Sequence, residues 1–371
     1  MADSTRGSRK GTLQPGRVVG DQYDGVAPRR TPPERSSATV PVNPPTMLAV
    51  VQDGYGAPER VLRLEEIRVP SIGADDVLIR TRATSVNTPD WAAVIGVPYI
   101  LRLGSGLRRP KRPVRGSDVA GVVEAVGQKV TDLAPGDEVF GSTRARAGAF
   151  AQHAVAPAAQ LVKKPAGLAF TDAAASVMTG LAALVAMRDV ARVGAGTRVL
   201  INGASGGVGT MAVQIAKVLG AEVTGVCGIR NVELVRSLGA DHVIEYTKED
   251  FTQSRQRFDV ILDNVLNHPP KASARMLAPK GVLIPNSIGY TGGLLAGLPR
   301  TARAVLMGFG STTVRLVTPA MNRENLDALR GLLETGAVRV VIDKTYPLEQ
   351  AASAVTRMLE HHASGKIVIA M

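Results

Sequence analysis

The chain has 371 residues, 45% of them hydrophobic, and a formal net charge of +12. This length predicts two domains with a sizeable core, and the single cysteine excludes an internal disulfide and a cysteine-based zinc cluster. The longest apolar stretch, Leu294 to Phe309, is interrupted by glycines, a proline and arginines, so no apolar run reaches the about 18 residues that a membrane span needs. We therefore expect a cytoplasmic protein without a membrane-spanning segment.

The positive charge raises the possibility of nucleic-acid binding, because a basic surface attracts phosphates. The loop from Leu101 to Arg115 holds six Arg or Lys residues and no acid. Such a loop can be a solvated rim, a docking surface or an entrance that attracts anions. Because Tyr99 is the only aromatic residue beside these charges, we favour the solvated rim and expect no nucleic-acid partner.

Residues 1 to 46 are rich in Arg, Pro, Ser, Gly and Thr. This composition predicts a disordered N-terminal tail, because such a segment buries too little apolar surface to offset its ordering entropy. Met47 begins the first predicted strand and is a candidate initiation site. From there, short apolar runs between Gly, Pro and Asp turns predict a mostly β first domain, with strands at 48–52, 62–67, 77–83, 118–126, 138–141 and 148–155.

Beyond residue 170, helices and strands alternate. Helices are predicted at 171–190, 211–219, near 271–277 and at 323–334, and strands at 199–201, 222–227, 258–262 and 281–285. This alternation predicts an α/β fold with a doubly wound parallel sheet. The end of the chain, with an extended piece at 344–347, a helix at 348–361 and a strand at 365–370, is expected to return to the first domain. The predicted domains are 47–170 completed by 340–371, and 171–339.

The stretch from Thr197 to Tyr246 predicts a strand, a glycine turn, a helix and a second strand. A helix N-terminus presents unpaired N–H groups and a positive dipole end, so it stabilises a pyrophosphate if the backbone can approach closely. Against the G-x-G-x-x-G template, the first glycine position is an alanine. We expect a dinucleotide to bind the residues of this turn, which are Ala204, Ser205, Gly206, Gly207, Val208 and Gly209.

The end of the second strand indicates which dinucleotide binds. An Asp or Glu there favours NAD, whereas an Arg accommodates the 2′-phosphate of NADP. The segment from Cys227 to Asn231 has no carboxylate, and Arg230 can bind a phosphate bidentately. We therefore predict NADPH, with contacts from Cys227, Arg230 and Asn231. In the alternative interpretation Arg230 only solvates the start of the next helix, and we interpret Cys227 as a small buried hydrophobe rather than a nucleophile.

Several motifs follow one another along residues 47 to 371: SVNTPDW at 85–91, GSDVAGVVEAVG at 116–127, PGDEVFG at 135–141, MTGLAAL at 178–184, GASGGVG at 203–209, LGADHVIEY at 238–246, YPLEQAASAVTRM at 346–358 and GKIVI at 365–369. In these motifs and their order the chain resembles the medium-chain dehydrogenase/reductase superfamily, specifically its zinc-free quinone oxidoreductase-like branch. The resemblance implies a GroES-like, mostly β catalytic domain, a Rossmann domain and a homodimer.

The zinc alcohol dehydrogenases of the same superfamily resemble this chain but differ at the metal site. They have a zinc-ligand cysteine where Asn87 stands and a His-Glu pair where Ser117 and Asp118 stand. They also carry a structural four-cysteine lobe, which a chain with one cysteine cannot form. An amide and a hydroxyl are poor zinc ligands. We therefore expect no metal.

The first domain supplies four candidate catalytic residues. Asn87 is the leading candidate for a hydrogen-bond donor near the nicotinamide or the substrate oxygen; in the alternative it ties together the strand end before Pro89. Asp90 fits a loop brace better than a general acid. Trp91 and Tyr99 can wall the substrate pocket or can be core and rim aromatics. The resemblance leaves the proton donor unidentified, since the segment AAVIGVPY departs from the tyrosines frequent in this branch.

Other cofactor contacts are implied by the resemblance alone. Thr179 matches the residue beside the nicotinamide amide, Tyr246 the residue near the adenosine 2′-phosphate, and Asn264 with Val265 the segment passing the nicotinamide ribose. Ser287 takes a similar lining position. As alternatives, Thr179 can bond back to its own helix and Tyr246 can be a strand-end core residue.

The resemblance implies hydride transfer from NADPH to a small electrophilic substrate, either a quinone or an α,β-unsaturated carbonyl, without zinc. An enoyl-thioester reductase is the alternative enzyme, whose basic rim would bind the phosphates of the substrate. A third hypothesis is a non-catalytic NADPH-binding regulator that contacts RNA or an acidic partner through the tail and the basic loop.

Overall fold

The computed structural model describes residues 45–99, 102–143, 148–287, 302–303, 306, 313–360 and 363–371. The chain divides into two compact units, Met1–Asn43 and Pro44–Met371. The predicted disordered tail lies outside the described residues except for Pro45 and Thr46, and so does almost all of the stretch Leu294 to Phe309. The second unit carries the sheets on which the site is built.

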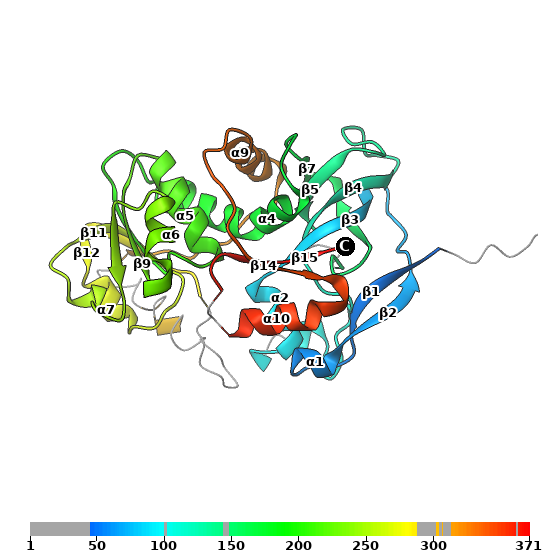
Figure 1. The fold of residues 1–371 in the computed structure, drawn as a ribbon, viewed down its shortest axis with the longest axis horizontal. Helices are drawn as coiled ribbons and strands as arrows, with labels where there is room; N and C mark the ends of the chain where they lie inside the picture. Colours follow the sequence, from blue (N-terminus) through cyan, green and yellow to red (C-terminus); the bar gives the residue numbers. More distant parts are fainter. Residues whose placement is uncertain are drawn as a thin grey trace, which may run out of the picture. The chain divides into compact units, whose positions relative to one another are not determined.

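Six strands of the second unit form a parallel sheet in the part of the chain that the structure describes. In sheet order they are β10 (His242–Glu245), β9 (Glu222–Cys227), β8 (Arg198–Asn202), β11 (Phe258–Asp263), β12 (Leu277–Pro285) and β13 (Thr313–Val314). The strand order reverses between β8 and β11, where the carboxyl ends of such sheets bind ligands. The predicted doubly wound sheet is confirmed. Along the chain its strands alternate with the helices α5 (Gly207–Val218), α6 (Val232–Ser237) and α7 (Pro270–Ala274) (Figure 1).

The mostly β region contains two further sheets among the described residues. Strand β1 (Thr46–Gln52) pairs with β2 (Leu62–Arg68). The other sheet has the order β14-β15-β3-β4-β5-β7, with β6 paired to β3; its strands are β3 (Asp76–Val86), β4 (Asp118–Val126), β5 (Glu138–Ser142), β6 (His153–Pro157), β7 (Leu161–Lys163), β14 (Ile342–Pro347) and β15 (Lys366–Ala370). Strand β7 and the short helices α1 (Pro58–Val61), α2 (Thr88–Ile95) and α3 (Arg102–Ser105) were not predicted, because each is too short to show a clear periodicity.

The C-terminal strand lies between β14 and β3 (Figure 1). Its antiparallel register pairs Ile367 with Val86, so Lys366 lies next to the residue that follows β3, Asn87. Helix α10 (Ala351–Leu359) packs its buried residues in the same apolar core as Trp91 and Ile369. The end of the chain thus contributes to the sheet that carries the first-domain motifs, while the predicted domain boundaries themselves stay a prediction.

Helix α4 (Phe170–Leu184) connects the two sheet regions and continues as a π-helical turn over Val185–Val190. It contacts β3, β4, β5 and β15 on one side and α5 and α9 (Arg323–Glu334) on the other. The segment Phe170–Val190 has the length and apolar composition of a membrane span, so the prediction that no stretch of the chain is long and apolar enough was wrong. Counting uninterrupted apolar runs missed it. Since 83% of its most apolar window is buried inside the fold, it is a core helix.

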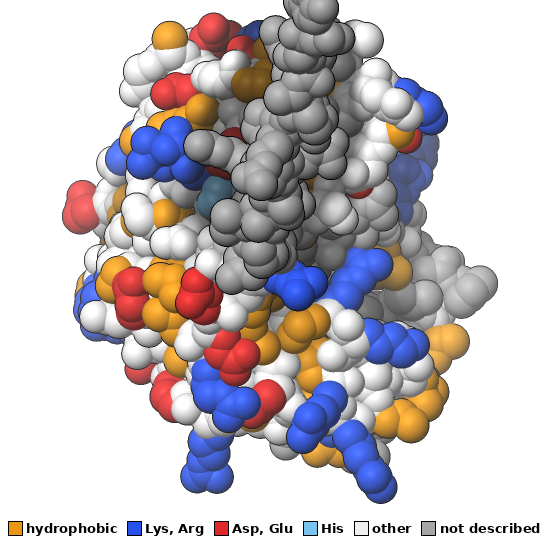
Figure 2. Space-filling model, turned by 90° about the vertical axis from the view of Figure 1, so that its right-hand side faces the viewer, with side chains coloured by type: hydrophobic (Ala, Val, Ile, Leu, Met, Phe, Trp, Pro, Cys, Tyr) orange, Lys and Arg blue, Asp and Glu red, His pale blue; other side chains and the backbone are white. Residues whose placement is uncertain are grey.

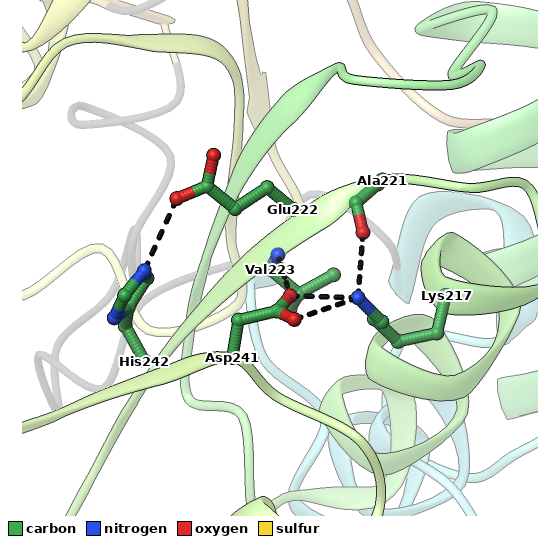
Figure 3. Close-up of polar contacts among 6 residues, drawn as sticks. All are labelled: Lys217, Ala221, Glu222, Val223, Asp241 and His242. Atoms are coloured by element: carbon green, nitrogen blue, oxygen red, sulfur yellow. Dashed lines mark hydrogen bonds and ion pairs between the residues drawn. The ribbon is translucent and has the colours of Figure 1, made fainter.

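A polar contact fixes the ends of α5, β9 and β10 that lie away from the carboxyl edge of the sheet (Figure 3). Lys217 donates to both carboxylate oxygens of Asp241, each at 2.8 Å, and to the carbonyl of Ala221 at 2.9 Å. Asp241 also accepts the Val223 N–H at 2.7 Å. Burial alone would raise the pKa of Asp241, but these hydrogen bonds hold it below its ordinary value. The contact therefore braces the sheet edge that carries β10.

Replacing Lys217 by Met should lower the free energy of unfolding by about 1 kcal/mol, because it leaves the buried Ala221 carbonyl and the exposed Asp241 carboxylate without their donor. Urea unfolding measures this change. The control is Arg236→Met, which removes an exposed pair with Glu233 on α6 and should cost less than about 0.5 kcal/mol. Equal losses in the two variants would contradict the bracing role.

Candidate active site

The glycine turn between β8 and α5 is shaped for close backbone approach. Gly203 has a φ of 76°, which favours glycine, while Ala204 beside it is fully buried. A Cβ on Gly209 would lie 2.1 Å from the Gly203 carbonyl oxygen, whereas a Cβ on Gly206 would meet nothing nearer than 3.5 Å. The residue with the left-handed backbone is therefore Gly203, one place before the first glycine position of the G-x-G-x-x-G template. This explains why that first position can be an alanine, Ala204. Gly206 caps α5, so an anion can reach the first N–H groups of that helix.

The residues at the end of β9 and β10 lie beside this turn. The amide of Asn231 donates to the Ser205 hydroxyl at 3.2 Å and accepts a hydrogen bond from the Ser364 hydroxyl at 2.7 Å. Arg230 is exposed, and Tyr246 is 56% exposed. The two side chains predicted to contact the 2′-phosphate are therefore accessible to a ligand.

The predicted contacts at the other strand ends differ in accessibility. Cys227 is buried, and burial raises the pKa of its thiol to about 11, as expected of an unreactive hydrophobe rather than a nucleophile. The Asn264 amide donates to the Asn202 carbonyl at 3.2 Å. Val265 and Ser287 are half-buried just beyond β11 and β12. The structure thus places these residues along the carboxyl edge of the sheet on both sides of its switch point.

Thr179 lies in α4 close to the glycine turn. Its hydroxyl donates to the Ala175 carbonyl at 3.0 Å, which is the bond back to its own helix considered above as the alternative. Its methyl group is 3.1 Å from where a Cβ on Gly207 would lie, and the Cδ of Lys366 is 2.9 Å from the same point. Gly206 and Gly365 also form a parallel backbone bridge. The turn, α4 and the start of β15 therefore meet at the first residue of α5.

Next to this meeting point lies a polar cluster that consists of Ser85, Asn87, Asp90, Asp118 and Lys366. Each of these residues is less than 7% exposed. Asn87 donates its amide N–H to Asp118 Oδ2 at 2.8 Å and accepts the Lys366 ammonium at 2.5 Å. Both ends of the amide are thus engaged, which matches the alternative in which Asn87 ties the strand end. Its role as a donor to the substrate stays a prediction.

Burial dominates the charges of the cluster. It raises the pKa of Asp118, although the Lys366 charge and hydrogen bonds from Ser85 and Asn87 act in the opposite direction. Burial likewise lowers the pKa of Lys366, and the charges of Asp118 and Asp90 oppose that change. The pKa of Asp90 is raised to about 7, first by burial and then by repulsion from Asp118. The three ionisable groups are therefore coupled.

Of the other candidate catalytic residues, Asp90 belongs to this cluster, whereas Trp91 and Tyr99 do not. Asp90 accepts the Asn87 backbone N–H at 2.9 Å and so closes the first turn of α2, as a brace would. Trp91 is buried in the apolar core with α10. Tyr99 is 46% exposed and stacks on the guanidinium of Arg102 at 4.2 Å. These positions match the alternative in which Trp91 is a core aromatic and Tyr99 a rim aromatic, and their role as pocket walls stays a prediction.

Sequence reasoning missed Lys366 as a site residue. The available signal was a lysine at the start of the apolar run KIVIA, since a charged residue in a strand buried on both faces needs partners. It also missed Ser364 and Ser85, which are common surface residues with no distinguishing pattern. Their partners come from segments more than thirty positions away along the chain.

The basic loop is only partly a solvated rim. Arg102 lies over the rings of Tyr55 and Tyr99, at 4.3 and 4.2 Å, and Arg115 donates to Gln52. The other four basic residues are exposed, as the rim interpretation predicts: Arg108, Arg109, Lys111 and Arg112. On the face shown in Figure 2, Lys and Arg side chains are scattered among acidic and apolar ones rather than joined in one patch.

The residues at the place of the zinc ligands do not fit a zinc ion. Asn87 and Ser117 offer an amide and a hydroxyl, and the single carboxylate, Asp118, already accepts hydrogen bonds from Ser85 and Asn87. The side-chain nitrogen of Lys366 lies 2.5 Å from the Asn87 oxygen, so that oxygen is already engaged. In the described part of the chain, no group of three or more His, Cys, Asp or Glu side chains could hold a metal.

The raised pKa of Asp90 predicts a loss of stability with rising pH. Because the folded pKa of about 7 exceeds the ordinary 3.8, the stabilising contribution of the neutral acid is complete below the ordinary pKa and disappears as pH rises through about 7. Asp90→Asn, which stays neutral, should therefore gain stability over the wild type between about pH 5 and pH 8, by on the order of 2–4 kcal/mol. Urea unfolding across this range measures the gain. The control is the exposed Asp75→Asn, and parallel pH profiles of wild type and Asp90→Asn would contradict the prediction.

Comparison with known proteins places the chain among oxidoreductases. Residues 73–166 match the alcohol dehydrogenase GroES-like domain, and residues 238–369 match the family described as zinc-binding dehydrogenase. The chain is 31% identical over 338 residues to a chloroplast envelope quinone oxidoreductase homolog of Arabidopsis thaliana, a match that covers 87% of this chain and 98% of that protein. It is 32% identical over 374 residues to the mitochondrial NAD(P)H oxidoreductase RTN4IP1 of Mus musculus, which covers 91% and 92%.

The fold has a close counterpart among solved structures. The quinone oxidoreductase from Coxiella burnetii superposes with a TM-score of 0.77 at 26% identity, over 88% of this chain and all of that one (100%). The matches with this structure and with the two relatives span both the GroES-like and the Rossmann regions and together support an enzyme with a nicotinamide cofactor and a small-molecule substrate. The chain therefore belongs to the medium-chain dehydrogenase/reductase superfamily, with relatives of the quinone oxidoreductase kind.

Proposed function

We propose that this protein is a zinc-independent, NADPH-dependent oxidoreductase that transfers a hydride to a quinone or an α,β-unsaturated carbonyl compound. The observation that carries this proposal is the contact between the two halves of the site. The glycine turn, which can hold a pyrophosphate, is bridged at Gly206 to Gly365, the residue before Lys366. A dinucleotide on the turn therefore extends toward the buried polar cluster.

Each half of the site has a distinct task. The N–H groups at the start of α5 bind the pyrophosphate, and Thr179 and Asn264 flank the path beyond it. When bound, a reduced nicotinamide supplies the hydride. Asn87, Asp118 and Lys366 form a buried surface that excludes water, so charge that develops there is poorly screened. Because the residues present do not suit a zinc ion, the acceptor is expected to be a carbonyl that conjugation already activates.

The preference for NADPH rests on Arg230. Its guanidinium is exposed next to Asn231, which hydrogen-bonds the turn through Ser205, and a 2′-phosphate at this position can accept two parallel hydrogen bonds from it. Tyr246 is exposed nearby and supplies a hydroxyl donor. These groups support selection of the phosphorylated cofactor.

Arg230→Ala should raise the Kd of NADPH by roughly ten- to a hundredfold, because a charge-assisted bidentate contact is lost. The Kd of NADH should change less than about threefold, since NADH lacks that phosphate. Titration of protein fluorescence with each cofactor measures both constants. Arg236→Ala, an exposed arginine on α6, serves as the control. A similar weakening of NADPH and NADH would mean that Arg230 does not read the phosphate.

The reaction itself is tested by measuring NADPH oxidation with quinones, enals and enoyl thioesters, in the presence of a strong zinc chelator. We expect turnover of a quinone or an enal that the chelator does not change. A marked preference for enoyl thioesters would mean that the acceptor is a thioester rather than a quinone or an enal. Turnover that disappears with the chelator and returns with zinc would overturn the zinc-independent reaction.

A further inference from the structure

A buried lysine lies where the cofactor half and the acceptor half of the site meet. Lys366 is 4% exposed at the start of β15, whose next residues, Ile367 to Ile369, are fully buried core. An ammonium in such a place is stable only with well-placed partners. Its contacts therefore indicate what the charge is positioned to do.

The contacts of Lys366 place its charge at the end of β3. Its Nζ donates to the Val86 carbonyl at 2.9 Å and to Asn87 Oδ1 at 2.5 Å. The opposite end of the Asn87 amide donates to Asp118, so the amide orientation is fixed on both sides. Asp118 is thus linked to the lysine through the amide rather than by a direct ion pair, within the part of the chain that the structure describes. Two of the three N–H donors of the ammonium are used in this way.

The Lys366 side chain points so that its ammonium lies away from the glycine turn. The stem of Lys366 passes over Gly207, where its Cδ lies 2.9 Å from a Cβ position, and the ammonium lies beyond, against the end of β3 and the start of α2. The ionisable groups around it in the described cluster are the carboxyl groups of Asp118 and Asp90, neither of which can carry a positive charge. The lysine is the member of that cluster able to attract an oxyanion.

We propose that the Lys366 ammonium is the electrophile of this site, donating its third N–H to the acceptor's carbonyl oxygen and stabilising the negative charge that forms there. The inference rests on the proposed hydride transfer. In a zinc enzyme the metal ion supplies the positive charge beside the carbonyl oxygen. Asn87 and Ser117 are poor zinc ligands, and in this proposal Lys366 supplies that charge instead.

The proposed step is a two-electron reduction of the acceptor. The hydride pair forms a new C–H bond at the β-carbon of the acceptor, the C=C pair shifts to form the enolate, and the carbonyl π pair moves onto oxygen. The acceptor gains two electrons and the reduced cofactor loses the same two. Solvent later supplies a proton to the enolate. A charge fixed in a dry site stabilises this oxyanion without reorganisation of solvent.

Lys366→Met keeps an unbranched side chain, one atom shorter, and removes its charge. We expect kcat for an enal to fall by about 10²- to 10³-fold, as for loss of an oxyanion donor, while the Kd of NADPH changes less than about threefold. Lys344→Met on the adjacent strand β14, where the side chain is exposed, should leave both unchanged. A raised Kd of NADPH with unchanged kcat would assign the lysine to the cofactor phosphates instead, and no change in either would make it structural; both results overturn the proposal.

Two further measurements separate charge from folding and from turnover. Ethylammonium should partly restore kcat to a Lys366→Ala variant, whereas ethanol should not; equal effects overturn the proposal. The probe 4-nitrophenol, added to the NADP⁺-loaded wild type, should bind as its phenolate about tenfold more tightly than in Lys366→Met. This arm needs no turnover, so it still decides the role of Lys366 if the acceptor panel fails and the proposed function falls. Equal binding, or no binding to the wild type, contradicts the lysine's role.

Discussion

The organisation of this site depends on one line of hydrogen bonds, which runs from the Lys366 ammonium through the Asn87 amide to the Asp118 carboxylate. The three residues come from β15, the end of β3 and the start of β4. A carboxylate requires the N–H₂ side of the amide and an ammonium requires its oxygen, so only one amide orientation satisfies both. Because the line is buried, a change at one end would leave the other ends without partners, which is costly in a dry interior.

The same C-terminal segment also contacts the glycine turn. Gly365 bridges to Gly206, and its N–H donates to the Ser205 carbonyl at 2.8 Å. Ser364 reaches Asn231, which bonds Ser205 in turn. Consecutive residues of one segment thus contact the glycine turn and the polar cluster. The distance between the two halves is set by backbone pairing rather than by flexible side chains, which suits a reaction that requires close approach of donor and acceptor.

The sequence allowed prediction of the features that depend on local pattern. The turn after β8, the alternation of helices and strands and the exposed Arg230 follow from apolar periodicity, glycine placement and the residues next to them. The polar cluster does not, because its contacts join positions such as Asn87 and Lys366, which are 279 residues apart. Asn87 was expected either to donate to the substrate or to tie the strand end; its contacts with Asp118 and Lys366 match the second interpretation, and its role as a donor stays a prediction. The positions of Trp91 and Tyr99 depend on packing of α2 against α10 and on Arg102, which no single-residue pattern reveals.

We propose that a charged lysine, rather than a metal ion, provides the positive charge of the site. The most direct measurement is an NMR spectrum that correlates the side-chain nitrogen of lysine with its protons, recorded near neutral pH on wild type and on Lys366→Met. We expect one ammonium signal that is protected from exchange with water, is absent from the variant and shifts when NADP⁺ binds. A Lys366 signal with the nitrogen shift of a neutral amine would contradict it.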